Sequence, residues 1–248
     1  IHRAYFDAGC DFVLTNTFGG NRSRLAHFGC AERVREFNLA GAQIAVRAKP
    51  ENGFVGGSVG PTGEFLEPFG TFTFEMLVEV FAEQISALVE GGVDVICIET
   101  ISDPAEGKAA IAAAKQVCSL PITATMTFMS GPAGYRTMMG CDARTGVRQL
   151  YDAGADVIGC NCGEGVTEAI DILREMRATL PTARLIVKPN AGLPQQSGDK
   201  IVYPITPLQM AESLREAQAI GASIVGGCCG TTPEHLRQIA RHMGKSAN

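Results

Sequence analysis

Four segments of the chain repeat one pattern: AGCDFVLTNT (8–17), GGVDVICIET (91–100), AGADVIGCNC (153–162) and IGASIVGGCC (220–229). Each has a glycine, one spacer residue, a small polar residue and then a run rich in β-branched side chains. Glycine tolerates the left-handed conformation just past a helix end, and a continuous apolar run is typical of a strand buried on both faces. The repeat therefore predicts a helix, a tight turn and a buried strand four times.

Three shorter apolar runs continue this rhythm, so that seven strands are expected in all. The additional runs are GFVGGSVG (53–60), PITATMTF (121–128) and ARLIVKPN (183–190). Between the strands, apolar residues at helical spacing predict helices at 32–48, 73–91, 104–118, 143–153, 165–180, 206–220 and 232–243, after an opening helix at 1–9. Asp103, Thr206 and Thr232 each precede a proline and mark sharp helix starts.

Strands that alternate with helices form parallel βαβ units, and eight such units close into a barrel. We therefore predict an α/β fold of the (β/α)₈ TIM-barrel class, with residues 1–248 as one barrel domain. The opening helix has no strand before it, so we expect the first strand to be missing from this chain. A doubly wound open sheet is the alternative, but no G-x-G-x-x-G turn follows a first strand.

The composition argues against several classes of protein. No apolar run is long enough to span a membrane, and a net charge of −5 without a basic cluster argues against a nucleic-acid partner. Nine cysteines, an odd number in a chain with a large core, indicate reduced thiols rather than a disulfide scaffold. Residues 1–9 have no signal or transit pattern, which favours a cytoplasmic location.

Three cysteines stand at predicted strand ends, where barrels of this class carry their chemistry. Cys162 ends DVIGCNCG (156–163), and Cys228 and Cys229 end SIVGGCCG (223–230). A catalytic zinc ion takes three protein ligands and keeps one position open. Neighbouring strand residues point to opposite faces, so Cys228 and Cys229 can share a metal only where the strand breaks. The flanking glycines permit that break: Gly226, Gly227 and Gly230. Core packing or a vicinal disulfide between Cys228 and Cys229 are the alternatives.

Taken together, the motifs resemble the zinc-dependent homocysteine S-methyltransferase family. They cover nearly the whole chain in the family's order: LTNTFGGNRSRL (14–25), VGPTGE (59–64), IETISD (98–103), GCNCGEG (159–165), KPNAGLP (188–194) and GGCCGTTPEH (226–235). The loops VGPTGE and KPNAGLP are most similar to the homocysteine module of the cobalamin-dependent methionine synthase branch.

The resemblance implies that Cys162, Cys228 and Cys229 hold Zn²⁺ and are the catalytic residues. Homocysteine would bind as a zinc thiolate and be methylated to methionine, with a methylated corrinoid (cobalamin) on another domain or protein as the donor. S-methylmethionine or betaine as the donor, or another thiol as the acceptor, are alternatives within the family. A zinc-thiolate module without turnover is a third, non-enzymatic alternative.

Five further residues are candidates for binding the substrate. Glu99 ends the strand VICIET and can bind an amine, and Asn190 ends LIVKPN and can clamp the substrate or the zinc loop. Asn161 lies between the site cysteines, and Asn16 can line the pocket. Ser58 stands where cobalamin-dependent relatives commonly carry an acid that helps to bind the amine of homocysteine, which leaves the acceptor open.

Overall fold

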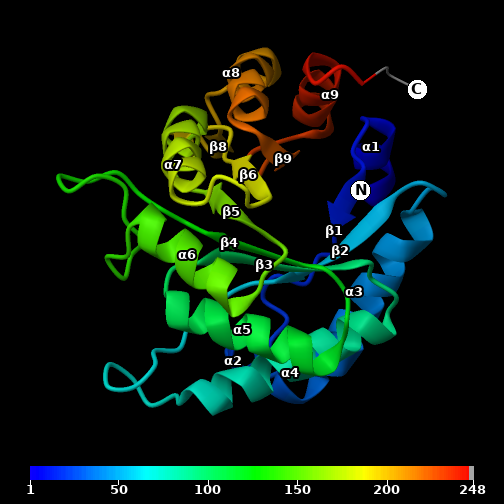
Figure 1. The fold of residues 1–248 in the computed structure, drawn as a ribbon. Helices are drawn as coiled ribbons and strands as arrows, with labels where there is room; N and C mark the ends of the chain where they lie inside the picture. The colour runs from blue at the N-terminus through cyan, green and yellow to red at the C-terminus, as the bar shows by residue number, and fades with distance from the viewer. Residues whose placement is uncertain (246–248) are drawn as a thin grey trace.

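The computed structural model describes residues 1–245 as an α/β fold with one parallel sheet at its centre (Figure 1). The sheet has seven strands in the order β1-β2-β3-β4-β5-β6-β9. Their bounds are β1 (Phe12–Leu14), β2 (Phe54–Val59), β3 (Val95–Ile101), β4 (Ile122–Met126), β5 (Val157–Cys162), β6 (Leu185–Pro189) and β9 (Ala222–Val225). Each strand pairs in parallel with its neighbours, as expected for βαβ units.

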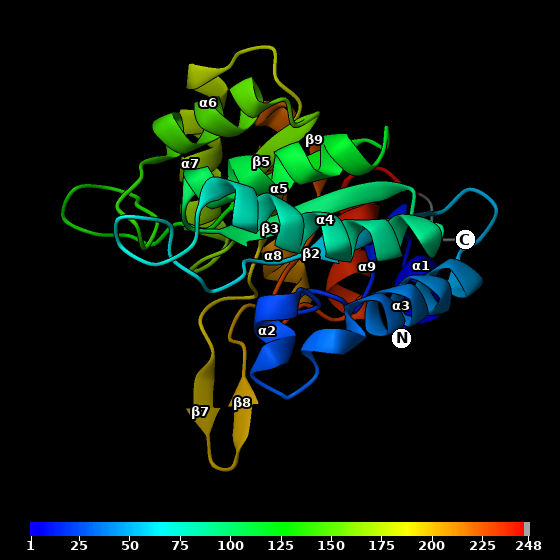
Figure 2. The same cartoon turned by 90° about the horizontal axis from the view of Figure 1, so that it is seen from below.

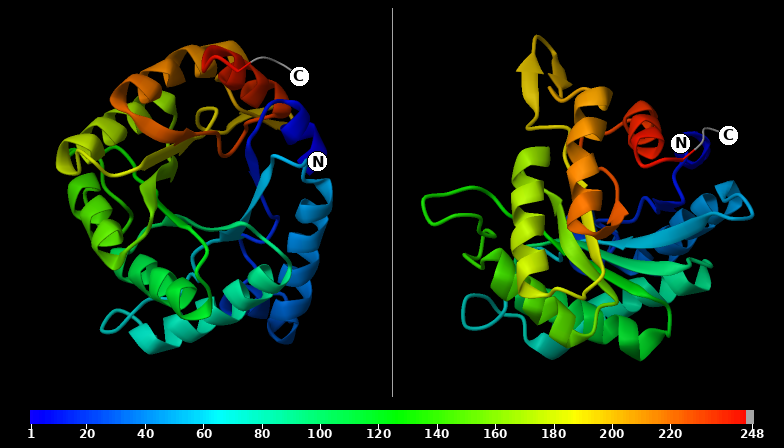
Figure 3. Two further views of the ribbon diagram at one scale, coloured as in Figure 1. Left: turned by 45° about the vertical axis from the view of Figure 1, so that its right-hand side comes forward. Right: turned by 45° about the horizontal axis from the view of Figure 1, so that its top comes forward.

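Helices follow the strands in alternation and form an outer layer around the sheet (Figure 3, left). They are α1 (His2–Asp7), α2 (Arg22–Ala26), α3 (Val34–Ala48), α4 (Phe74–Glu90), α5 (Pro104–Val117), α6 (Ala143–Ala153), α7 (Val166–Thr179), α8 (Pro207–Ile220) and α9 (Pro233–His242), with a 3-10 turn at Ala31–Arg33. Within residues 1–245, no helix is both long and apolar enough to cross a membrane.

The sheet curls into a partial TIM barrel, which confirms the predicted fold class and the seven predicted strands. Within the described residues, β1 and β9 are its two edges and do not pair with each other. The central strands are buried on both faces: Val55, Ile96, Ile98, Ala124 and Leu185 have no exposed surface. Continuous apolar runs were therefore the correct signal for these strands.

The predicted turns also form as expected. Gly154 and Gly221 end α6 and α8 with φ values of 92°, a conformation that other residues adopt only at a cost. The Asp103 side chain accepts a hydrogen bond from the Ala105 N–H at the start of α5. Thr206 forms a capping box with Gln209 at the start of α8.

The prediction missed two local structures, the helix α2 and a hairpin. The hairpin strands β7 (Gln195–Ser197) and β8 (Lys200–Val202) pair antiparallel and project from the body of the molecule (Figure 2). All six residues are exposed, so no apolar alternation marks them. Only the turn at Gly198 (φ 60°), within SGDK, was a signal for a hairpin.

Candidate metal and thiol site

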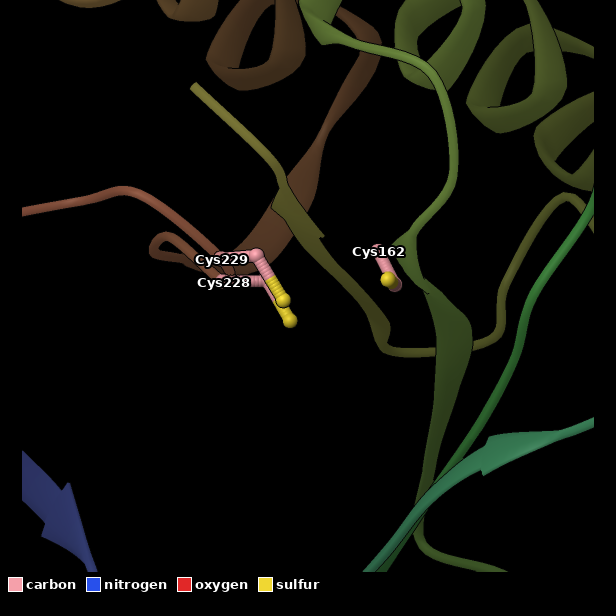
Figure 4. A group of neighbouring side chains, drawn as sticks. All are labelled: Cys162, Cys228 and Cys229. Atoms are coloured by element: carbon pink, nitrogen blue, oxygen red, sulfur yellow. The ribbon is translucent and has the colours of Figure 1, made fainter. Parts of the chain in front are cut away.

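The three predicted cysteines meet at the carboxyl ends of β5 and β9 (Figure 4). Their sulfur atoms all lie within 4.8 Å of one another. Sulfur ligands about 2.3 Å from a tetrahedral zinc ion lie about 3.8 Å apart, so a small closure would bring the thiols to bonding distance. All nine cysteines are free, which is contrary to a vicinal disulfide. The number and type of these donors fit a zinc ion with one open position.

The end of β9 shows how two adjacent cysteines reach one site. The strand ends at Val225, yet the backbone stays bound to β6: the Gly226 N–H donates to the Val187 carbonyl (3.0 Å) and the Cys228 N–H to the Pro189 carbonyl (2.9 Å). The sulfur atoms of the adjacent residues Cys228 and Cys229 nevertheless lie in one cluster, which alternating residues of a regular strand could not achieve, and the Thr231 hydroxyl donates a hydrogen bond to the Cys228 carbonyl (2.7 Å). The predicted glycine-permitted break is confirmed.

Asn190 links Cys162, at the end of β5, to Cys229, in the loop after β9. Its amide nitrogen donates to the Gly163 carbonyl (2.7 Å) and to the Cys162 sulfur (3.5 Å), and its amide oxygen accepts from the Cys229 N–H (3.0 Å). Cys162 has a φ of 64°, which is uncommon for a residue with a side chain. Asn190 therefore holds a strained turn on one strand against the loop of another.

Asn161, on the neighbouring strand β5, connects the cysteine cluster to β3 and β4. Its oxygen accepts from the Thr100 N–H (2.8 Å) and the Thr125 hydroxyl (2.6 Å), while its nitrogen donates to the Thr100 hydroxyl (2.8 Å) and the Cys228 sulfur (3.6 Å). Thr100 has a φ of 65°, an outlier for a β-branched residue. This contact orients the backbone next to Glu99 and connects it to the cysteines.

The three thiols have very different acidities because they hydrogen bond to one another. The pKa of Cys228 is lowered, chiefly because the Cys162 and Cys229 thiols donate to its sulfur, with Asn161 and the charge of Lys188 adding to the effect against burial. The pKa values of Cys162 and Cys229 are raised, first by that same bond and then by burial. These opposite shifts favour loss of the Cys228 proton before those of Cys162 and Cys229.

Three polar side chains, one each from β2, β3 and β6, meet in the barrel interior. The Glu99 carboxylate accepts from the Ser58 hydroxyl (2.5 Å) at one oxygen and from the Lys188 ammonium (2.6 Å) at the other. All three are buried, at 2% exposure for Ser58, 7% for Glu99 and 6% for Lys188. Ser58 and Glu99, predicted separately from the sequence, are thus direct partners.

The sequence analysis did not single out Lys188, although a signal was present. The strand LIVKP (185–189) is buried throughout and carries this one charged residue, and a buried lysine is rare unless it is paired or functional. Asn16 is exposed at the end of β1 and lines a cavity of about 1090 Å³ that Lys188 and Cys228 also line. The next residue, Thr17, is buried, and its hydroxyl donates a hydrogen bond to the Ser58 carbonyl (2.8 Å).

Two methionine synthases are similar in sequence to this chain. The methionine synthase of Mycobacterium tuberculosis is 35% identical over 254 residues, which cover 97% of this chain and 21% of the relative. The methionine synthase of Mycobacterium leprae is 34% identical over 259 residues, with 99% and 21% coverage. The chain thus spans about a fifth of the length of these curated relatives.

Solved structures match the fold over almost the whole chain. The metallated form of the homocysteine methyltransferase MmuM from Escherichia coli has a TM-score of 0.79 at 21% identity, covering 97% of this chain and 82% of that one. Its apo form has a TM-score of 0.73 at 21% identity, with 98% and 83% coverage. A profile of the homocysteine S-methyltransferase family matches residues 1–243. The chain therefore belongs to the homocysteine S-methyltransferase family.

Proposed function

We propose that this barrel is a zinc-dependent S-methyltransferase that binds homocysteine through its sulfur and methylates it to methionine. The observation that carries the proposal is the cluster of three thiols at the ends of β5 and β9, with Cys228 on the wall of a cavity. Family membership supports homocysteine as the acceptor. Zinc held by the three cysteines would supply a positive centre that keeps the acceptor sulfur deprotonated at neutral pH.

The chain's own residues would fix the geometry of the transfer. Asn161 and Asn190 hold the two cysteine-bearing loops in register through the hydrogen bonds described above. The acceptor sulfur forms the new bond to the methyl carbon with its own electron pair, and the electrons of the old bond leave with the donor. No protein base is needed at that step, because the acceptor has lost its proton on binding.

We propose a methylated corrinoid, carried on another domain or protein, as the donor. Support comes from the two relatives, both named methionine synthase, of which this chain matches about a fifth. S-methylmethionine and betaine are the competing donors, since Ser58 stands where an acid is common in cobalamin-dependent relatives. The site and the proposed zinc chemistry would be the same with any of them.

The test starts with metal content and acceptor binding in the purified protein. We expect one zinc ion per chain, lost in Cys228→Ser and retained in the control Cys30→Ser, whose half-buried cysteine precedes the 3-10 turn and is not part of the cluster. Homocysteine should bind the zinc-loaded protein with release of a proton. A protein without zinc affinity, or one that binds zinc but no homocysteine, would refute the proposal.

The donor is identified by methionine formation with four candidates in parallel. Methylcobalamin, a methylated corrinoid protein, S-methylmethionine and betaine are each supplied with homocysteine to the zinc-loaded protein. We expect turnover with the methylated corrinoids. Turnover with S-methylmethionine or betaine alone would keep the methyltransferase assignment and exclude the corrinoid donor.

A further inference from the structure

The motif GGCCGTTPEH (226–235) ends in a histidine that the proposed zinc chemistry does not use. His235 lies in the first turn of α9 and is buried, at 7% exposure. It is not part of the cysteine cluster. Each ring nitrogen of a buried imidazole normally has a hydrogen-bond partner, so the two partners show which parts of the chain His235 connects.

The two ring nitrogens of His235 bind different segments of the chain. The Thr232 N–H donates to Nδ1 (3.2 Å), so Nδ1 is the ring nitrogen without a proton. Nε2 then carries the proton and donates to the Ile205 carbonyl (3.0 Å). One nitrogen therefore caps α9, and the other links α9 to the residue just before the start of α8.

The cap alone does not require a histidine. α8 begins with the same order of threonine, proline and a polar third residue, and there the Gln209 amide oxygen accepts from the Thr206 N–H (2.9 Å). Within residues 1–245, the Gln209 side chain bonds only to Thr206. His235 differs from Gln209 in its second bond, to Ile205. This second bond indicates a role beyond capping.

The bond from His235 to Ile205 closes a ring of hydrogen bonds around the loop that carries Cys229. The Ala191 N–H donates to the Cys229 carbonyl (2.9 Å), and the Ile205 N–H donates to the Ala191 carbonyl (3.0 Å). His235 then connects the Ile205 carbonyl to Thr232, which follows Cys229 in the same loop. The loop is thus tied to the chain between β6 and α8 at both of its ends.

We propose that His235 is a positioning residue that holds the Cys229 thiol at the zinc site through its bond to Ile205. The inference rests on the proposed function, because it takes the three thiols to be zinc ligands. Without the Nε2 donor, the Cys229 loop keeps only its anchors at Asn190 and Ala191. Groups that orient metal ligands from outside the coordination sphere change metal affinity by about 10–100-fold when they are lost.

Two neutral variants separate the cap from the link. The oxygen of Asn lies near the position of Nδ1, so His235→Asn can accept from the Thr232 N–H but is too short to reach Ile205. Gln extends as far as Nε2, so His235→Gln can donate to Ile205 through its amide nitrogen. Thr73→Ala, which removes the hydrogen bond that caps α4 at the Met76 N–H, is the control for lost helix stability.

The first measurement is zinc affinity by competition with a chromophoric chelator. We expect His235→Asn to bind zinc at least about 10-fold more weakly than the wild type, and His235→Gln to stay within about threefold of it. Thr73→Ala should bind zinc like the wild type. Unchanged affinity in His235→Asn would overturn the proposal, and so would an equal loss in His235→Gln or Thr73→Ala.

The second measurement uses cobalt(II) in place of zinc, because its absorption depends on the number and geometry of the thiolate ligands. A loss of helix stability alone would leave that absorption unchanged. We expect weaker thiolate-to-cobalt charge-transfer bands in His235→Asn, and wild-type bands in His235→Gln and Thr73→Ala. Identical bands in all of these proteins would show that His235 only stabilises α9, which refutes the positioning role.

His235→Glu replaces His235→Asn in both measurements if the asparagine variant does not fold. A glutamate at the third helical position also caps, but its carboxylate has no donor for the Ile205 carbonyl. The same results are then expected and the same results overturn the proposal. A wild-type protein that binds neither metal would instead refute the proposed function, and this inference with it.

Discussion

Two residues of the site, Thr100 and Cys162, have left-handed backbone conformations that each cost on the order of 1–3 kcal/mol. Such strain persists only where surrounding contacts hold it, and here two asparagine amides do so. Asn161 binds both the N–H and the hydroxyl of Thr100, and Asn190 binds Gly163 and the Cys162 sulfur. We infer that both amides pre-organise the thiols for a metal ion.

Asn190→Ala tests this role at the level of one side chain. Without the amide, the Cys162 turn and the Cys229 loop are no longer tied together, and we expect zinc affinity to fall about 10–100-fold. Competition with a chromophoric chelator measures the change. Asn52→Ala, at an exposed asparagine in a turn, is the matched control. Equal zinc affinity in Asn190→Ala and wild type would show that the amide does not organise the site.

The acidities of the thiols predict the proton balance of metal binding. Raised pKa values keep Cys162 and Cys229 protonated at neutral pH, while the lowered pKa of Cys228 makes it a thiolate. Binding of zinc by three thiolates should therefore release about two protons, and affinity should rise with pH through the neutral range. Calorimetry in buffers of different ionisation enthalpy counts the protons. Release of three would contradict a preformed thiolate at Cys228.

At the scale of secondary-structure elements, the loop after β9 determines whether Cys228 and Cys229 face one site. Gly230 has a φ of +79°, and a Cβ there would lie 2.1 Å from the Tyr203 ring. Gly140 has a φ of +80° with nothing within 4 Å of such a Cβ. These two glycines share the backbone conformation and differ in the space around them.

Gly230→Ala and Gly140→Ala therefore separate backbone strain from steric overlap. We expect Gly140→Ala to lose about 1–2 kcal/mol of unfolding free energy from the left-handed conformation alone, with zinc binding unchanged. Gly230→Ala should lose more and also weaken zinc binding, because the loop must move away from Tyr203. Urea unfolding and zinc content measure both effects. Equal losses in the two variants would mean that packing on Tyr203 does not position the loop.

At the scale of the whole molecule, the cysteine cluster joins parts of the barrel that are distant in sequence. Cys162 ends β5, whereas Cys228 and Cys229 follow β9, and β6 lies between these strands in the sheet. The sulfur atoms nevertheless come within 4.8 Å, because the sheet curls. A bound metal would therefore link the ends of β5 and β9 across the intervening strand β6.

Zinc should accordingly slow amide hydrogen exchange in a local pattern. A ligand that binds only the folded state raises the free energy of every opening that breaks its site. We expect added protection at 160–164 and 226–232, and no change in the exposed hairpin strands β7 and β8. Exchange followed by mass spectrometry with and without zinc measures this. Uniform protection of the whole chain would contradict a local link.

The strands, the turns before them and the cysteines at strand ends could be predicted from the sequence, because each depends on residues that are close together in the chain. A glycine before a β-branched run predicts a strand after a turn, and cysteines at the ends of such strands predict a site at one face of a barrel. The hairpin β7–β8 was missed because its exposed residues have no apolar pattern. Lys188 was missed because a single lysine in a strand does not identify its partner.

The sequence by itself determined the seven strands, their alternation with helices and the three thiols at strand ends, since each depends on neighbouring residues. Only the tertiary structure decided that Glu99 pairs with Lys188, 89 residues away, and with Ser58, 41 residues away. It also decided that Asn161 holds Thr100, 61 residues away. These pairings depend on the curvature that brings interior side chains of different strands together, and no local pattern encodes that distance.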